Sequence, residues 1–179
     1  MQADDVLRFW LEELDNKARF AKDEALDARM RQRFGATLDA ASRGELWAWR
    51  RTPQGRLAEV IVLDQFSRNI HRGDAQAFAN DALALGLAQE AVAAGADRLL
   101  APAERAFLYM PYMHSESAAI HALAVALFSQ PGLEHNLDFE LRHKAIIDRF
   151  GRYPHRNAVL GRASTAEEAA FLQTPGSSF

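Results

Sequence analysis

The chain has 179 residues and a mass of 20.0 kDa, with 49% hydrophobic and 25% charged side chains and a formal net charge of −3. This composition excludes disordered, collagen-like and disulfide-stapled proteins, and the length favours a single domain, expected over residues 1–173. Because cysteine is absent, thiol nucleophiles and zinc knuckles are excluded, and the near balance of 21 basic and 24 acidic residues gives no general attraction for nucleic acid.

The beginning of the chain lacks the features of a targeting segment. Met1 to Asp5 lead directly into an amphipathic stretch, without the basic and apolar regions of a signal peptide. No apolar run approaches the roughly 20 residues that a membrane span requires. We therefore expect a cytoplasmic protein with no nucleic-acid partner and no membrane partner.

Apolar residues recur at helical spacing along nearly the whole chain, which predicts an all-α fold of about nine helices without a sheet. The polar stretch 15–23 is expected to be a loop, and residues 174–179 a loose C-terminal tail. Ser164 and Glu167 have the spacing of a capping box, which predicts the start of the last helix. The main helices are expected at residues 3–14, 24–41, 56–71, 74–94, 116–130, 135–150 and 165–173, with shorter ones at Trp47–Trp49, after Pro102 and after Pro154.

Successive helices with short connections pack most simply as antiparallel hairpins. Stacked hairpins form a tetratricopeptide-like α-α superhelix with a concave face, and this is the architecture we expect. The sequence has no convincing repeat of roughly 34 residues, so an irregular bundle is the alternative. An exposed Trp47 or Trp49 on the convex face could support a homodimer.

The expected helix 135–150 has apolar residues on two opposite faces. Leu137 and Leu141 lie on one face, and Phe139 and Ile146 lie roughly opposite. This pattern predicts a helix that is covered on both sides.

The apolar stripe of the expected helix 56–71 continues as Asp64, Arg68 and His71 on the same face. Asp64 and Arg68 are four residues apart and can form an ion pair in a partly buried groove. One interpretation is a structural network that joins helices. The other is a functional site in which Arg68 or His71 contacts a ligand or a proton.

Residues 142–162 contain six basic side chains and one acidic one, in a chain whose net charge is −3. Arg152 and Arg156 surround the start of an expected short helix, where free backbone N–H groups favour an anion. The planar fork of arginine binds carboxylate or phosphate in a bidentate way. The segment therefore predicts an anion pocket, or else ion pairs of Arg152 and Arg156 with Asp64 and Glu116.

The segment from Tyr109 to Glu116 contains Pro111, which must end or kink a helix because proline lacks a backbone donor. His114 and Glu116 could form an acid/base pair there, or a metal pair completed by distant ligands. The spacings of zinc, phosphate and dinucleotide motifs are absent. We therefore predict no metal and no cofactor.

Four blocks of the sequence occur in order along the chain. They begin at Leu63, Ala77, Tyr109 and Arg149 and read LDQFSRNIHRG, AFAxD, YMPYMHSE and RFGRYPHRN, the last followed by LGR and ST. Together they closely resemble the bacterial domain of unknown function 924 family. The resemblance covers nearly the whole chain. It implies an all-helical, tetratricopeptide-like fold and brings no established reaction, substrate or cofactor.

We expect the charged segments to meet in a concave groove. The first hypothesis is a binding module that takes a small anionic molecule or an acidic peptide of a protein partner. The alternatives are a small-molecule hydrolase with histidine and carboxylate acid/base chemistry, and a structural protein-interaction scaffold. The candidate ligand-binding residues are Arg68, Asn69, His71, Arg152, Arg156 and Asn157. The candidate catalytic residues are His114, Glu116, His155 and Asp64.

Overall fold

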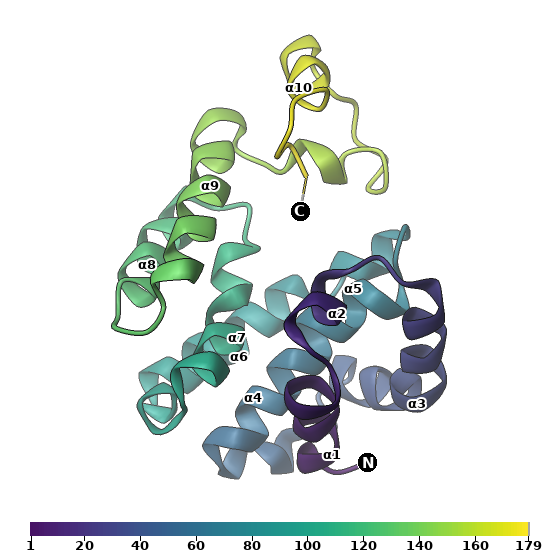
Figure 1. The fold of residues 1–179 in the computed structure, drawn as a ribbon, viewed down its shortest axis with the longest axis vertical. Coiled ribbons are helices and arrows are strands. Elements are labelled where there is room, and N and C mark those ends of the chain that lie inside the picture. Colours follow the sequence, from purple (N-terminus) through teal and green to yellow (C-terminus); the bar gives the residue numbers. More distant parts are fainter. Residues whose placement is uncertain (179) are drawn as a thin grey trace.

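The structure is a computed structural model that describes residues 1–178, and these residues form helices and turns without a β-strand. The all-α class predicted from the apolar periodicity is therefore confirmed. Figure 1 shows the path of the chain through the helices. The α-helices are α1 Ala3–Leu7, α2 Asn16–Phe20, α3 Glu24–Ser42, α4 Pro53–Ile61, α5 Ser67–Ile70, α6 Asp81–Ala93, α7 Pro102–Met113, α8 Ala118–Phe128, α9 Glu134–Phe150 and α10 Ala166–Phe171. Segments of π-helix extend α1 over Arg8–Glu13 and α4 over Val62–Phe66, and 3-10 segments lie at Trp47–Arg51, Ala75–Phe78, Ala96–Leu99 and Pro154–Arg156.

Aromatic rings form the centre of the N-terminal half. The ring of Phe34 in α3 lies 4.8 Å from the ring of Phe9 and 4.8 Å from the ring of Phe66, measured between centroids. All three side chains are fully buried, and Trp10 packs against Phe66. Rings of this size bury a large apolar area. The cluster therefore holds α1 and α3 against the helix that carries Asp64.

The central helix is continuous from Pro53 to Ile70 and consists of α4, a π-helical stretch and α5. Its bounds agree with the expected helix 56–71. The side chain of Thr52 caps its start by accepting from the backbone N–H of Gly55. Every residue from Leu57 to Ser67 is buried. The π-helical turn contains Asp64, so this helix places a carboxylate inside the molecule.

The stretch 15–23, expected to be a loop, contains the short helix α2. Asp15 caps α2 by accepting from the backbone N–H of Ala18. Arg19 donates to three backbone carbonyls at the end of the preceding helical segment, which have no partner of their own there. The expectation of a loop was wrong. No residue of α2 is buried, so the helix leaves no apolar pattern in the sequence, and polar contacts stabilise it instead.

The expected helix 74–94 is divided into a 3-10 segment and α6. Asp74 caps the 3-10 segment by accepting from the backbone N–H of Gln76 at 2.8 Å. The chain then turns, and α6 begins at Asp81. The division places Phe78 at the end of the 3-10 segment and Asp81 at the start of α6, and both line the cavity described below.

The second half of the chain consists of helices that pack on their neighbours in sequence. α7 packs on α8, and α8 packs on α9, as Figure 1 shows. Pro111 lies in the last turn of α7, which ends at Met113, as the missing donor predicts. The prediction that α9 is covered on both sides is wrong, since Phe139 is 38% exposed and Leu141 48% exposed.

The C-terminal segment begins at Gly151, whose positive φ of 69° ends α9. The capping box of α10 lies one residue later than expected. Thr165 accepts from the backbone N–H of Glu168, and the Glu168 side chain accepts from the backbone N–H of Thr165. Residue 179, the end of the expected tail, lies outside the described residues. Within residues 1–178, no helix combines the length and the apolar character that a membrane crossing needs.

Candidate active site

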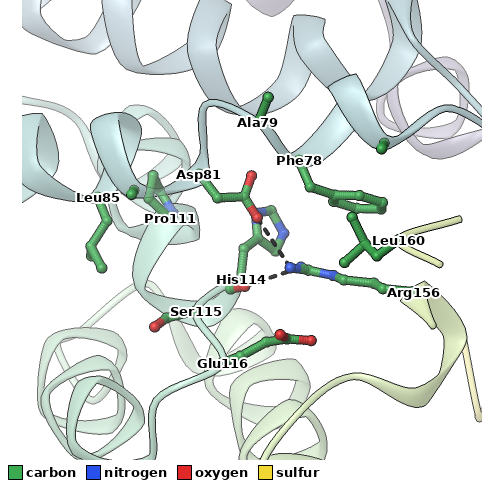
Figure 2. A pocket seen from close by; sticks show the side chains of 12 residues that line it. Phe78, Ala79, Asp81, Leu85, Pro111, His114, Ser115, Glu116, Arg156 and Leu160 are labelled. Atoms are coloured by element: carbon green, nitrogen blue, oxygen red, sulfur yellow. Dashed lines mark hydrogen bonds and ion pairs between the residues drawn. The ribbon is translucent and has the colours of Figure 1, made fainter. Parts of the chain in front are cut away.

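A cavity of about 400 Å³ lies between the start of α6, the end of α7 and the segment that follows α9 (Figure 2). Apolar side chains from the α6 region line one part of it. Polar side chains line the rest. The polar lining residues are Asp81, His114, Ser115, Glu116 and Arg156.

His114, at the end of α7, is hydrogen-bonded to Asp64 of the central helix. Nδ1 of His114 lies 2.7 Å from Oδ1 of Asp64, and Asp64 is 1% exposed. An ionised carboxylate only accepts hydrogen bonds, so Nδ1 is the donor and Nε2 carries the lone pair of the neutral ring. Nε2 makes no hydrogen bond to any residue in the range 1–178. His114 lines the cavity, and its side chain is 16% exposed.

The surroundings of this pair favour an ionised carboxylate and a neutral imidazole. Burial alone would raise the pKa of Asp64, but Arg68, His114 and Gln65 outweigh burial and hold this pKa well below its usual value. Burial lowers the pKa of His114, and the opposing attraction of Asp64 is the weaker effect. At neutral pH, His114 is therefore a base whose orientation is fixed by a buried anion.

Asp81 joins two arginines that come from distant parts of the chain. Its carboxylate lies 3.0 Å from Arg68 and 3.1 Å from Nη1 of Arg156. Arg68 also lies 3.1 Å from Asp64. Two carboxylates and two guanidinium groups therefore alternate in one network. Asp81 is not among the site residues predicted from the sequence, although the second of the four family-like blocks ends at this residue.

Arg156 contacts two aromatic rings. Its guanidinium carbon lies 4.6 Å from the ring centroid of Phe78 and 4.6 Å from that of Tyr153. Its side chain is 7% exposed, and burial lowers its pKa from the usual value. The contacts with two rings restrict the orientation of the guanidinium group. Arg156 therefore occupies one orientation beside His114.

Three consecutive carbonyls at the end of α7 accept hydrogen bonds from side chains of the second half of the chain. Tyr153 donates its hydroxyl proton to the carbonyl of Met113 at 2.5 Å. Arg156 donates to the carbonyl of His114 at 3.0 Å, and Nε2 of His121 lies 2.8 Å from the carbonyl of Ser115. Carbonyls at a helix end otherwise lack partners. These bonds fix the backbone that carries His114.

Glu116, a candidate catalytic residue, uses both carboxylate oxygens in contacts within the protein. Arg162 donates to them at 2.6 and 2.9 Å, and the backbone N–H of Tyr153 donates at 2.7 Å. Burial would raise the pKa of Glu116, but these donors together lower it. Glu116 therefore lies in the cavity wall as an ionised carboxylate that connects α7 to the C-terminal segment.

Arg152 and Asn157, two candidate ligand residues, lie outside the cavity lining. Arg152 donates to both oxygens of Glu168, at 2.6 and 2.8 Å. Asn157 is buried, donates to Ser164 and accepts from Arg162. Both side chains stabilise the C-terminal segment. The basic character of residues 142–162 is largely cancelled in the fold by carboxylates from other segments.

Asn69 and His71 belong to another part of the molecule. Asn69 donates to Asp27 at 2.8 Å, and Arg72 donates to the same carboxylate at 2.5 and 3.0 Å. These groups line a smaller cavity of about 220 Å³ beside α3. His71 ends α5, and its side chain forms no hydrogen bond or ion pair within the described chain. Neither Asn69 nor His71 lines the larger cavity.

Three further histidines surround Tyr153. Burial lowers the pKa of His155, a catalytic candidate, to about 4, and that of His143 to about 3. The rings of His155 and His143 lie 5.5 and 5.8 Å from that of Tyr153. His121 is fully buried, with Nδ1 2.7 Å from Glu140. These residues form the support behind the cavity and are not part of its lining.

No three His, Asp or Glu residues within positions 1–178 form a group arranged to hold a metal ion. The lining of the larger cavity includes one imidazole, that of His114, and an imidazole can exchange a proton near neutral pH.

Residues 6–176 match the family described as "Bacterial protein of unknown function (DUF924)". The chain belongs to the DUF924 family. It is also similar to the solved "Structure of Protein of Unknown Function ATU0120 from Agrobacterium tumefaciens", with 37% sequence identity, coverage of 96% of both chains and a TM-score of 0.90. No curated protein matches the chain. The family and the fold of this DUF924 protein are therefore shown, and neither the family nor the solved structure carries an assigned function.

Proposed function

We propose that the cavity is the active site of a small-molecule hydrolase in which His114 is the general base. The observation that supports this most strongly is the hydrogen bond of 2.7 Å between His114 and Asp64 in a cavity wall. A buried carboxylate on Nδ1 fixes the tautomer, leaves the lone pair on Nε2 and stabilises the imidazolium that forms when the base takes a proton. Asp64 acts here as a positioning residue.

A water molecule is the nucleophile that fits this geometry. Ser115 follows His114 and lines the cavity, but its hydroxyl is not hydrogen-bonded to the imidazole within the described residues. Figure 2 shows the Ser115 side chain directed away from the His114 ring. His114 would therefore take a proton from water as the oxygen attacks a carbonyl carbon, without a covalent enzyme intermediate.

The anion-binding hypothesis has less support at this site. Arg156 and Arg68 each have a carboxylate of the protein within 3.1 Å, and Arg152 pairs with Glu168 away from the cavity. An anionic ligand would have to compete with these pairs. No specific contact favours the scaffold hypothesis over the other two.

The test is hydrolysis of a panel of p-nitrophenyl esters by the wild-type protein and the His114→Gln variant. Glutamine keeps the size and polarity of the side chain but cannot act as a base. We expect kcat/KM to fall by about 100-fold or more, since general base catalysis contributes that much. His135→Gln is the matched control, because His135 is exposed on α9 and lies outside the cavity lining. Equal rates in wild type and His114→Gln, or no turnover of any ester, would contradict the proposal.

A further inference from the structure

We infer that the substrate of this site is an uncharged acyl compound whose apolar portion lies against the α6 side of the cavity. The inference rests on the proposed hydrolase function and goes beyond it, because it names the chemical class of the substrate. Two observations support this inference: the charged side chains at the site are paired with one another, and one wall of the cavity is mainly apolar while the other is polar.

The charges at the cavity cancel. Asp64 and Asp81 face Arg68 and Arg156, and every carboxylate of this set lies within 3.1 Å of a guanidinium group. Glu116, the remaining charged residue of the lining, is bound by both Nη atoms of Arg162. His114 is neutral at neutral pH because burial lowers its pKa. The cavity therefore presents no uncompensated charge for an ionic ligand.

Ionic ligands would also disrupt contacts that the fold needs. A bound anion would compete with Asp81 for Arg156, and a bound cation would compete with two arginines for Asp81. Removing one partner of a buried ion pair is costly, because the other charge then stays buried and unpaired. An uncharged ligand leaves the network intact.

Apart from Asp81, the residues that line the cavity from the α6 side are apolar. The apolar lining residues come from the 3-10 segment before α6, from α6, from α7 and from the C-terminal segment, and they are Ala75, Phe78, Ala79, Ala82, Leu85, Pro111 and Leu160. Figure 2 shows Phe78 and Ala79 on one side of His114, and Ser115 and Glu116 on the other. Burial of an apolar group of the substrate on the side of Phe78 and Ala79 would therefore favour binding.

The positions of the two walls orient the substrate. His114 lies between them, so a carbonyl carbon at the junction of an apolar acyl chain and a polar leaving group would lie beside Nε2. The cavity volume of about 400 Å³ is within the usual range for sites of small molecules. Water would attack this carbon, the bond to the leaving oxygen would break, and the proton taken by His114 would pass to that oxygen.

The test uses three p-nitrophenyl esters of similar acyl length and different charge. They are the uncharged pentanoate, the anionic hemisuccinate and the cationic γ-aminobutyrate. We expect kcat/KM for the pentanoate ester to exceed kcat/KM for each charged ester by at least about 10-fold. A charged acyl group loses its hydration on binding and finds no unpaired group of opposite charge in the cavity. A charged ester that is hydrolysed as well as the pentanoate would overturn the inference.

A pair of variants on α6 locates the acyl group. Ala82→Leu adds a side chain to the cavity wall, whereas Ala93→Leu adds the same side chain to an exposed position at the other end of α6. We expect Ala82→Leu to raise KM for p-nitrophenyl pentanoate several-fold more than KM for the shorter p-nitrophenyl acetate. Ala93→Leu should change neither KM value. An equal effect of the two variants would place the acyl group elsewhere.

Binding measurements test the chemical class of the ligand independently of the proposed hydrolase activity. Pentanamide, pentanoate and pentylammonium are titrated into wild type, Ala82→Leu and Ala93→Leu, and binding is followed by NMR chemical-shift changes. If no ester is hydrolysed but pentanamide binds more tightly than both ions, and Ala82→Leu alone weakens it, the ligand class stands and the hydrolase function falls. Tighter binding of either ion, or no binding of pentanamide, overturns the inference whatever the hydrolysis assay shows.

Discussion

Nδ1 of His114 lies 2.7 Å from Oδ1 of Asp64, although the two residues are 50 positions apart in the sequence. One residue ends α7 and the other lies in the π-helical turn of the central helix. Their contact therefore depends on the packing of two buried helices and does not depend on a flexible loop. A base that is held in this way keeps its orientation before a substrate binds.

Replacing Asp64 by asparagine should remove most of the activity. The neutral amide neither fixes the tautomer of His114 nor stabilises its protonated form, so we expect kcat to fall by roughly 1,000-fold or more. The measurement is kcat for p-nitrophenyl pentanoate. Asp27→Asn is the matched control, because Asp27 is also a buried carboxylate held by arginine, but it lies in the other polar cluster. Similar losses of kcat in both variants would show a general effect on folding.

Arg156 should position His114 as well as stabilise the protein. Arg156→Met removes the donor to the His114 carbonyl and one of the partners of Asp81. We expect the free energy of unfolding in urea to fall by about 1–3 kcal/mol, and kcat to fall while KM changes little. Arg152→Met removes the partner of Glu168 outside the cavity and should lower stability with kcat unchanged. A normal kcat in Arg156→Met would show that this arginine has a structural role alone.

The buried pair of His121 and Glu140 should share one proton. Nε2 of His121 must donate to the Ser115 carbonyl, so the proton between Nδ1 and Glu140 leaves the pair neutral overall, whichever of the two atoms carries it. Burial raises the pKa of Glu140. Glu140→Gln should therefore leave stability at neutral pH unchanged or increased, whereas His121→Leu should cost about 3–5 kcal/mol by leaving Glu140 unpaired. Urea unfolding of both variants checks this, and a large loss in Glu140→Gln would show that the carboxylate itself is required.

The stability of the protein should decrease as the pH falls below 6.5. Burial lowers the pKa of His143 to about 3 and that of His155 to about 4, from an ordinary value of 6.5. Below pH 6.5 the unfolded chain binds protons that the folded protein does not, so the free energy of unfolding falls with falling pH. Urea midpoints across this range measure the slope. The double variant His143→Gln/His155→Gln should show a smaller slope, and an unchanged slope would contradict the assignment to these histidines.

Long apolar periodicity predicted the helices that build the core. The expected helices 24–41 and 135–150 agree closely with α3 and α9, because both carry apolar residues at helical spacing, Asp23 caps the start of α3 and Gly151 ends α9. α2 could not be found in this way, since Asp15 and Arg19 stabilise it through backbone contacts and it has no buried face. Contacts between single polar side chains and the backbone do not recur at a regular spacing, so a search for apolar periodicity cannot detect them.

The site was predictable only in part, because its contacts join distant segments. Asp64, Arg68, His114 and Arg156 were selected from the sequence as charged residues in unusual positions, and the fold places them in one network. Asp81 was missed because it looks like an ordinary acidic residue in the first turn of a helix. Its partners Arg68 and Arg156 lie 13 and 75 positions away. The sequence also could not show which arginines are neutralised by the fold.

The pH dependence of kcat/KM for p-nitrophenyl pentanoate, compared between wild type and His114→Gln, tests the central claim most directly. If His114 is the base, the wild-type value rises with pH through an apparent pKa below 6.5, because burial lowers the pKa of this imidazole, and then becomes constant. In His114→Gln the rise disappears and the plateau is about 100-fold lower or more. The same profile and the same plateau in both proteins would contradict the assignment of His114 as the catalytic base.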